Sequence, residues 1–426
     1  MKTLLLGAGG RESALAWALS RSGMISELAA APGNPGIASV APLFDLDPAD
    51  ERAVVDLARR LGSELVVVGP EAPLVAGVGD ALRADGRLVF GPDAAAARIE
   101  GSKWHAKELM RRAGIPTAEG AVFTDARAAV DHADRLGPPY VIKADGLAAG
   151  KGVMVTSDRG EAVDAIEQRL VAGALGAAGA TVVVEEFLDG PELSLIAFVD
   201  GATARPCEPA QDYKRIDDGD RGPNTGGMGA YSPVPACSAE LVESLMGEVI
   251  EPMVKMTATT DPPAPFVGAL YAGLALTTRG PRVIEFNARF GDPETQALLP
   301  RLGSDLGELC VACATGDLAG FEPRWSTEVC VAVVLSAAGY PGSHATGAPI
   351  EGLDDAARIE GAHIFHAGTA IRDGATVTAG GRVLAVAATG ADFGSARTRA
   401  YTAADRIRFE GKHVRRDIAR RAEEAR

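Results

Sequence analysis

The sequence predicts a multidomain protein of mixed α/β and α+β class. Its 426 residues are too many for one hydrophobic core, because single cores stop growing at about 250–300 residues. Strands and helices alternate over residues 1–100, as in a parallel sheet covered by helices. From about residue 324 the pattern changes to short strands separated by glycine-rich turns. We therefore expect an N-terminal α/β domain over 1–100, a central domain over 101–323 and a small, mainly β C-terminal domain over 324–426.

Composition and charge limit the classes of function. The chain is 47% apolar and 23% charged, and its net charge of −15 argues against nucleic acid or an anionic membrane as a main partner. No apolar run is long enough to span a bilayer, and glycines interrupt the apolar N-terminus too early for a signal peptide. Cys310 and Cys313 share one face of a helical pattern, which favours core packing over metal or redox chemistry. We expect a cytoplasmic metabolic enzyme. No coiled coil is visible in the sequence, so we expect a monomer, although the sequence leaves the oligomeric state open.

The first domain begins with a glycine-rich strand-to-helix turn. The expected strands are Thr3–Leu6, Leu65–Val68 and Leu88–Phe90, and the expected helices are Glu12–Ser20, Ala49–Leu61 and Ala72–Ala84. The turn Gly7–Glu12 lies where backbone N–H groups and the helix dipole hold a phosphate or a carboxylate. A dinucleotide site, as in a nicotinamide-dependent dehydrogenase, is the alternative. It is disfavoured because the motif lacks the third glycine and no clean ribose-binding acid follows at the usual offset.

Glu285 and Asn287 are the candidate metal ligands. Residues 283–286 have the β-branched and aromatic character of a strand, on which successive side chains point to opposite faces. Glu285 and Asn287 should therefore share one face, while Ile284 and Phe286 point into the core. A carboxylate beside an amide oxygen suits Mg²⁺, or Mn²⁺, which takes its other ligands from water and substrate phosphates.

The turn after this strand brings further charge to the same place. Arg289 follows directly, and Gly291 and Pro293 turn the chain so that Asp292 and Glu294 lie beside the arginine. Charged residues also gather at ordinary solvated strand ends, but such an end does not need a turn that holds acids against an arginine. We therefore predict a metal–nucleotide site with Arg289 and Asp292 as catalytic residues.

Residues 140–155 predict a glycine-rich loop between two strands, with Lys143 at the end of the first strand and Lys151 in the loop. Glycines let backbone N–H groups approach an anion, and the lysines add positive charge for phosphates. These glycines are Gly146, Gly150 and Gly152. The segment is neither a Walker A loop nor a protein-kinase loop. A plain β-hairpin is the alternative, but the lysines favour a flap that closes over ATP.

A third segment, 181–192, completes the nucleotide site. The apolar run Val182–Val184 predicts a buried strand, and the linker Glu185–Leu188 that follows offers backbone groups to an adenine edge. Glu192 lies after a Gly-Pro turn and is placed to bind ribose hydroxyls. Acidic residues follow strands in many proteins, so this segment gains weight only from its position between the other two.

The three segments, in this order and spacing, resemble the ATP-grasp superfamily. Further motifs resemble one of its families, phosphoribosylamine–glycine ligase (glycinamide ribonucleotide synthetase): Gly7–Glu12, Ala31–Gly36, Gly69–Leu74, Glu100–Lys103, Gln211–Arg215 and Gly222–Pro233. The resemblance covers essentially the whole chain, to the RRDI segment near Asp417. One departure is Ser13, where the family usually has a histidine; a hydroxyl at a helix N-terminus can still cap the helix, but any imidazole role there is in doubt.

The resemblance implies an ATP-grasp core with a small lid lobe over about 118–188, and a C-terminal domain packed on the active site. It also implies ATP-dependent ligation of glycine to 5-phosphoribosylamine in de novo purine (IMP) biosynthesis. Glycine's carboxylate is a poor electrophile, and transfer of the γ-phosphoryl group of ATP converts it to glycyl phosphate, which the amine attacks. Phosphoryl transfer depends mostly on positioning and charge neutralisation, so no protein nucleophile is required.

The expected site residues form two groups beside the metal ligands. The expected ATP-binding residues are Lys103, Lys143, Gly150, Lys151, Gly152, Val153, Glu185, Glu186, Leu188 and Glu192. The resemblance implies that phosphoribosylamine and glycine contact Gly9, Gly10, Arg11, Glu12, Glu71, Asp212, Lys214, Asn224, Gly226, Gly227 and Arg289, and that Lys143 is catalytic with Arg289 and Asp292. For the residues around Asn224, a tight turn without ligand contact is the alternative.

Other ligases and biotin-type carboxylases are the rival predictions within the superfamily. Many of them place an additional metal-binding acid on the strand before Glu285, but here that strand, Ala269–Thr277, has none. This favours the glycine ligase and leaves open which groups complete a second metal site. A non-catalytic nucleotide sensor would need decayed substrate-side residues, and these are intact.

Overall fold

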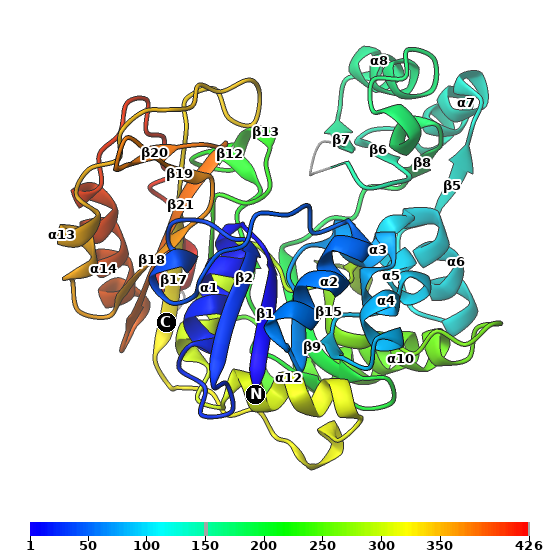
Figure 1. Cartoon of the computed structure of the whole chain (residues 1–426). Coiled ribbons are helices and arrows are strands. Elements are labelled where there is room, and N and C mark those ends of the chain that lie inside the picture. Colours follow the sequence, from blue (N-terminus) through cyan, green and yellow to red (C-terminus); the bar gives the residue numbers. More distant parts are fainter. Residues whose placement is uncertain (149–151, 425–426) are drawn as a thin grey trace.

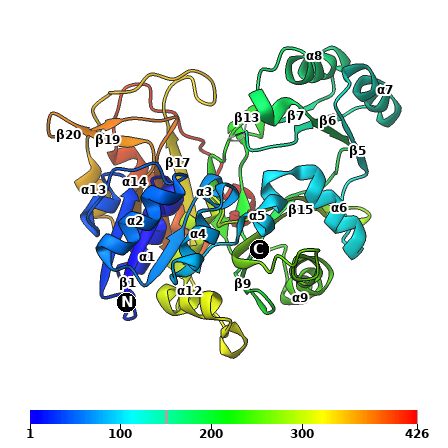
Figure 2. The ribbon, with the colours of Figure 1, turned by 45° about the vertical axis from the view of Figure 1, so that its right-hand side comes forward.

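A computed structural model of the chain describes residues 1–148 and 152–424. In Figure 1 the N-terminal sheet lies in the centre, the C-terminal strands lie to the left and a small lobe stands at the upper right. Figure 2, turned by 45°, again shows this lobe on the side of α5 (Ala94–Gly101) and α6 (Lys103–Ala113), away from the C-terminal strands. The architecture is multidomain with mixed helices and strands, as the sequence predicts.

The N-terminal sheet has four parallel strands in the order β2-β1-β3-β4. They are β1 (Lys2–Gly7), β2 (Glu27–Pro32), β3 (Leu65–Val68) and β4 (Leu88–Phe90). Three of the four strands were predicted. The sequence analysis missed β2, because its sequence ELAAAP has no β-branched or aromatic residue, although Ala30 and Ala31 are fully buried.

The helices of this domain are α1 (Gly10–Leu19), α2 (Glu51–Leu61), α3 (Glu71–Ala76) and α4 (Val78–Ala84). The prediction of one continuous helix over 72–84 is wrong. Gly77 adopts φ +100, a left-handed conformation that ends α3 and starts α4. The break makes α3 a short helix, whose first residue is Glu71, directly after the N-cap Pro70.

The central domain is built on an antiparallel sheet of order β10-β9-β15-β16. Its strands are β9 (Glu192–Asp200), β10 (Ala204–Pro206), β15 (Val267–Thr277) and β16 (Gly280–Asn287). Helices α9 (Ala239–Leu245), α10 (Glu251–Ala258), α11 (Glu294–Leu298) and α12 (Leu306–Thr315) complete it. Cys310 and Cys313 of α12 lie fully buried in the core, and burial raises the pKa of both thiols, so the prediction of core packing is confirmed.

The small lobe has its own sheet, of order β5-β8-β6-β7, and its own apolar core. The strands are β5 (Gly120–Phe123), β6 (Tyr140–Ala144), β7 (Val153–Thr156) and β8 (Val182–Glu185), with helices α7 (Ala126–Leu136) and α8 (Arg159–Leu170). Tyr140 and Ile142 belong to the apolar core of the lobe. Because strand side chains alternate, Lys143 points to the opposite face of the lobe.

The C-terminal strands share a sheet with part of the central domain. The five-stranded sheet runs β11-β14-β17-β21-β18, and its strands are β11 (Gln211–Asp212), β14 (Gly229–Ser232), β17 (Val329–Ser336), β18 (Ala362–His366) and β21 (Arg382–Gly390). A hairpin of β19 (Thr369–Arg372) and β20 (Ala375–Thr378), with helices α13 (Leu353–Ala357), α14 (Phe393–Arg406) and α15 (Arg420–Glu424), completes this part. Because β14 pairs with β17, the segment that precedes β14 is joined directly to the C-terminal strands.

None of the helices in the described chain combines the length and the hydropathy that a bilayer-spanning segment requires.

A buried arginine attaches the chain's C-terminal segment to the hairpin of β12 (Arg215–Asp217) and β13 (Arg221–Asn224). The Arg415 side chain is fully buried, lies 4.7 Å from the Tyr213 ring centroid and donates to the Arg215 carbonyl at 2.9 Å. It also pairs with Asp417 at 2.7 Å and with Asp220 at 3.0 Å. The RRDI segment therefore holds the hairpin that leads into Asn224.

We predict that Arg415→Met destabilises the protein by about 3 kcal/mol, because removing one partner of a buried ion pair leaves the other partners uncompensated. Thermal melting should shift downward, and amide hydrogen exchange should increase in the β12–β13 hairpin. Arg416→Met is the matched control, since Arg416 pairs with Asp405 at 2.8 Å with both side chains about half-exposed. Such surface pairs contribute about 0–1 kcal/mol. Equal effects of the two substitutions would contradict this account.

Candidate active site

The predicted metal ligands lie on one polar face of the central sheet. Glu285 pairs across the ladder with Gly273, and Asn287 pairs with Tyr271. The Tyr271 hydroxyl lies 3.0 Å from the Ser194 hydroxyl of β9, which donates to Glu294 at 2.9 Å. The residue opposite Glu285 is thus a glycine, and the Tyr271 ring lies 3.3 Å from where a Cβ of Gly273 would be.

A β-bulge changes the expected alternation of β16. The register shifts between Gly273 and Leu274, so that Leu274 pairs with Val283 and Ile284 is the extra residue. Val283 and Phe286 are buried in the core, whereas Ile284 is only half-buried, so the prediction that Ile284 points into the core is wrong. The bulge frees the Ile284 carbonyl, which accepts a hydrogen bond from Lys143 Nζ at 3.0 Å.

The donor set fits a hard divalent cation that shares its coordination with phosphates. No cluster of three or more His, Cys, Asp or Glu suited to a metal occurs within residues 1–148 and 152–424. Protein oxygens from Glu285 and Asn287 would therefore supply part of the coordination, as is usual for Mg²⁺ bound with nucleotides. Burial would raise the pKa of Glu285, but Lys103, whose Nζ lies 3.7 Å away, and Lys143 outweigh burial and lower it.

Lys143 connects the small lobe to the central sheet. Besides the Ile284 carbonyl, its ammonium contacts the Glu185 carboxylate, which also pairs with Lys107 Nζ at 2.7 Å. All three side chains are almost completely buried. Asp145, just after β6, adds a second link, since it accepts from Ser102 Oγ at 3.0 Å and from the Trp104 N–H at 2.9 Å.

The linker predicted to bind adenine leaves β8 at Glu185. The Glu186 N–H donates to the Glu119 carbonyl at 2.8 Å, and the Glu186 carboxylate pairs with Arg279 at 2.7 Å. Glu186 is thus held by protein groups, and the Glu185 side chain is held by lysines. Leu188 lies on the linker between β8 and β9, where its backbone groups take part in no hydrogen bond within the described chain. The adenine contact of this linker stays a prediction.

Glu192, predicted for ribose, and Asp212 and Lys214, predicted for substrate, are brought together. Lys214 Nζ lies 2.6 Å from Glu192 and 2.9 Å from Asp212. Burial raises the pKa of Asp212 to about 7, with Glu294 and Glu192 adding to the rise against the opposing effect of Lys214. Burial would lower the pKa of Lys214, but Asp212 and Glu192 raise it well above its usual value. Several carboxylates thus share one ammonium group at the edge of the polar face.

Arg289 lies between two glutamates from different parts of the chain. Its Nη2 lies 2.8 Å from Glu100 and its Nε lies 3.2 Å from Glu71. Glu100 also accepts from the Ala288 N–H at 2.7 Å. Burial by itself would raise the pKa of Glu71, but the guanidinium groups of Arg289 and Arg11 outweigh it and hold the pKa at about 2. These contacts fix the guanidinium beside the metal pair.

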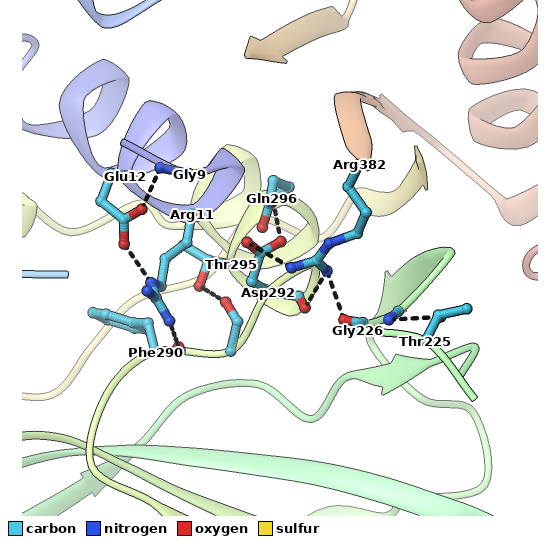
Figure 3. Close-up of polar contacts among 12 residues, drawn as sticks. Gly9, Arg11, Glu12, Thr225, Gly226, Phe290, Asp292, Thr295, Gln296 and Arg382 are labelled. Atoms are coloured by element: carbon cyan, nitrogen blue, oxygen red, sulfur yellow. Dashed lines mark hydrogen bonds and ion pairs between the residues drawn. The ribbon is translucent and has the colours of Figure 1, made fainter. Parts of the chain in front are cut away.

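The glycine-rich turn of α1 faces the same region. The Gly9 N–H donates to the Glu12 carboxylate at 2.6 Å, and Glu12 pairs with Arg11 Nε at 2.5 Å (Figure 3). Arg11 also donates to the Phe290 carbonyl at 3.2 Å. A Cβ added at Gly10 would lie 2.6 Å from the Gln296 amide nitrogen, so this position accepts no side chain without rearrangement. The side chains of Glu12 and Gln296 therefore pack directly against Gly9 and Gly10.

The expectation that Ser13 caps α1 is wrong. Gly9 is the N-cap, and the Glu12 carboxylate satisfies its N–H. Ser13 lies within the first turns of the helix, where its hydroxyl accepts from the His366 N–H at 3.1 Å. Ser13 therefore joins α1 to the end of β18.

The loop Asn224–Gly229, which we call the substrate loop after its predicted role, lies against the turn at Asp292. The Thr225 hydroxyl donates to the Lys214 carbonyl at 2.9 Å and accepts from the Gly227 N–H at 3.0 Å. Gly227 adopts φ +108, and a Cβ there would lie 2.4 Å from Pro293. Arg382 of β21 contacts both the loop and the turn (Figure 3). The structure thus brings the loop beside Asp292.

Gly152 and Val153 lie at the end of the glycine-rich segment. Gly152 directly precedes β7, and Val153 begins this strand and pairs with Lys143 across the β6–β7 ladder. Gly150 and Lys151 lie outside the described residues. The roles of these four residues in ATP binding stay predictions.

Three residues that hold predicted site residues in place were not themselves predicted from the sequence. Glu100 was part of a recognised motif, but only the structure reveals that it holds Arg289. Lys107 follows Lys103 by one helical turn and shares Glu185 with Lys143. Arg382 lies in a glycine-rich turn more than fifty residues beyond the central domain, and nothing in its local sequence indicates contact with the site.

Family models cover nearly the whole chain. The N domain of phosphoribosylglycinamide synthetase matches residues 1–100, its ATP-grasp (A) domain matches residues 101–295 and its C domain matches residues 330–421. Two curated relatives are each described as phosphoribosylamine–glycine ligase. The protein from Streptomyces coelicolor is 55% identical over 426 residues, and that from Rhizobium meliloti is 51% identical over 422 residues; 99% of this chain and of each relative is covered.

Solved structures give the same result for the fold. The crystal structure of a phosphoribosylamine–glycine ligase from Thermotoga maritima matches with a TM-score of 0.83 and 34% identity, covering 98% of this chain and 100% of that chain. The biotin carboxylase domain of a Hydrogenobacter thermophilus 2-oxoglutarate carboxylase, solved with MgADP and bicarbonate, matches with a TM-score of 0.73 and 18% identity, covering 97% of this chain and 91% of that chain. At that identity the likeness concerns the fold alone.

We predict a pH-dependent stability contribution from Glu71. Its pKa of about 2 in the folded protein lies below the usual 4.5, so the contribution is complete above pH 4.5 and is lost as pH falls toward 2. The shift corresponds to at most about 3 kcal/mol. Glu71→Gln should melt below wild type at pH 7, and the gap should narrow below pH 4.5. A gap that stays constant from pH 7 to pH 3 would refute the assignment.

Glu285→Gln separates a metal ligand from a structural residue. The substitution keeps the shape and removes the charge, so the stabilisation that MgATP gives the wild type should shrink, since it depends on ligand concentration over dissociation constant. The melting temperature without ligand should change little, because the contact with Lys103 at 3.7 Å is partly exposed. Glu308→Gln, an exposed change on α12, serves as the control. If the unliganded variant melts far below wild type and keeps the full MgATP shift, Glu285 is structural.

Proposed function

This chain belongs to the phosphoribosylglycinamide synthetase family, and we propose that it joins glycine to 5-phosphoribosylamine at the expense of ATP. The products are glycinamide ribonucleotide, ADP and phosphate, and the reaction is a step of purine biosynthesis. One observation supports the proposal: five predicted site residues lie together at one end of β16, beside the substrate loop and the glycine-rich helix start. They are Glu285, Asn287, Lys103, Lys143 and Arg289.

The reaction proceeds in two steps on the polar face. A carboxylate oxygen of glycine attacks the γ-phosphorus of ATP, the bond to the β-phosphate oxygen breaks, and ADP leaves. The amine of phosphoribosylamine then attacks the carbonyl carbon of glycyl phosphate, loses a proton and expels phosphate. Both steps move negative charge onto phosphate oxygens, which preorganised cations stabilise.

The chain's own residues supply those cations in fixed positions. Glu185 and the Ile284 carbonyl orient Lys143, and Glu71 and Glu100 orient Arg289, so neither group has to reorganise during the reaction. Lys103 stands beside Glu285 at the N-terminus of α6. At the start of α1 the Gly9 N–H is bound by Glu12, so the N–H groups of Gly10 and Arg11 are those that a phosphate or carboxylate could use.

Glu285 and Asn287 would hold Mg²⁺, or Mn²⁺, which when bound neutralises phosphate charge and orients the transferring group. The polar face suits this role, because the strand pairing places Glu285 and Asn287 on it together. We also propose that the residues assigned to ATP and to the substrates from the sequence bind these molecules. The domain boundaries at residues 100 and 323 and a cytoplasmic location are part of the same proposal. Small molecules are the expected partners.

A biotin-type carboxylase is the alternative with the same core fold. The position across from Glu285, where an additional acid would complement the metal pair, is Gly273. This observation favours the glycine ligase.

The prediction is strict dependence on both co-substrates. ADP should form at full rate only with glycine and freshly generated phosphoribosylamine together, in amounts equal to glycinamide ribonucleotide. Coupled-enzyme ADP detection and mass spectrometry of the product measure this, with each substrate omitted in turn. Comparable ADP release with D-alanine, bicarbonate or acetate in place of glycine would rule out the assignment.

A further inference from the structure

Arg382 begins β21, in the C-terminal part of the chain, and its guanidinium reaches two segments of the candidate site. Nη1 donates to the Gly226 carbonyl at 2.6 Å and to the Asp292 carbonyl at 2.8 Å. Nη2 lies 3.2 Å from the Asp292 carboxylate. One side chain thus joins the substrate loop to the turn that follows the metal strand (Figure 3).

The C-terminal part also holds the other backbone group of Gly226. The Gly226 N–H donates to the Tyr340 hydroxyl at 2.9 Å, and the Tyr340 ring packs on Gly381, where an added Cβ would lie 2.3 Å from the ring. Gly226 therefore has both its N–H and its C=O bound by side chains from beyond residue 324. An added Cβ at Gly226 would lie 3.1 Å from the Arg382 guanidinium carbon, so loop and guanidinium are in close contact.

Asp292 connects these contacts with the start of α1. Its carboxylate accepts from the Gln296 amide at 2.8 Å, and it would lie 3.7 Å from a Cβ added at either Gly9 or Gly10. Burial would raise the pKa of Asp292, but Arg382 and Arg11 outweigh it and lower the pKa. Arg382 thereby keeps Asp292 ionised at the point where the substrate loop, the aspartate turn and the glycine turn meet.

We propose that Arg382 is a positioning residue for the glycine and phosphoribosylamine side of the reaction. It fixes the substrate loop against Asp292 and makes the C-terminal part a structural component of the active site. This inference rests on the proposed ligase function. Among its contacts, none involves Lys103, Lys143, Glu185 or Glu285, so binding of ATP should not depend on it.

The test compares Arg382→Gln, Arg382→Lys and Tyr340→Phe with wild type. Loss of a charge-assisted hydrogen bond and a small displacement of reacting groups commonly cost about ten- to hundredfold in rate. Arg382→Gln should therefore lose about ten- to hundredfold in kcat/KM for glycine and for phosphoribosylamine. The KM for ATP and the melting shift caused by MgATP should stay within about twofold of wild type.

The other variants show whether the geometry or only the charge is needed. Lysine keeps the charge near Asp292 but lacks the planar fork that reaches both carbonyls, so Arg382→Lys should recover only part of the loss. Tyr340→Phe should show a smaller loss in the same direction, and the double variant should lose less than the two single losses multiplied, because both residues hold Gly226. Arg408→Gln is the control, since Arg408 is 71% exposed and pairs only with exposed Glu351.

Wild type, assayed in parallel, separates the two hypotheses. If wild type releases no ADP with both co-substrates, the proposed function fails. If wild type is active and Arg382→Gln keeps all kinetic constants, or loses ATP affinity in the same proportion as the other substrates, the positioning role is wrong. A lower melting temperature with unchanged kinetics of the folded variant would likewise assign Arg382 to stability alone.

Discussion

The buried ion pairs of Arg289 are the constraint on which the site depends. A guanidinium removed from water needs compensating acceptors, and here they come from Glu71 at the start of α3 and Glu100 near the end of α5. The Ala288 N–H, which also donates to Glu100, ties the end of β16 to the same carboxylate. The N-terminal domain and the central sheet are thereby fixed to each other at the residues that follow Glu285 and Asn287.

Three further junctions of the molecule also use cations that are largely withdrawn from water. Lys143 reaches from the small lobe to a bulge carbonyl of β16, Arg382 reaches from β21 to the substrate loop, and Arg415 holds the hairpin before that loop. A buried cation is costly unless its donors are satisfied, so each contact strongly favours one relative position of the two segments.

The sequence predicted the parts of the fold that have strong local signals. Three strands of the N-terminal sheet, the strands around the glycine-rich loop and the polar face of β16 follow from β-branched runs and alternation. The alanine-rich β2 gave no such signal, and the bulge at Ile284 depends on pairing with β15, which local sequence does not encode. The roles of Arg382 and Glu100 were not predicted for a related reason: they depend on contacts with residues far away in the chain. Glu285, Asn287 and Arg289 were recognisable because one strand and one turn carry all three.

The loop Asn224–Gly229 depends on the C-terminal part of the chain for its order. An added Cβ at Gly227 would lie 2.4 Å from Pro293, and one at Gly226 would lie 3.1 Å from the Arg382 guanidinium carbon, so both glycines are in close contact with their surroundings. A loop of this kind contacts its surroundings mainly through backbone groups, and glycine backbones lose much conformational freedom when they are ordered. External donors and acceptors must supply that order. Arg382 and Tyr340 do so from β21 and the segment after β17, whereas Lys143 of the small lobe is held by Glu185 and the Ile284 carbonyl. The loop beside Asp292 and the lysine beside β16 are therefore held by different parts of the chain.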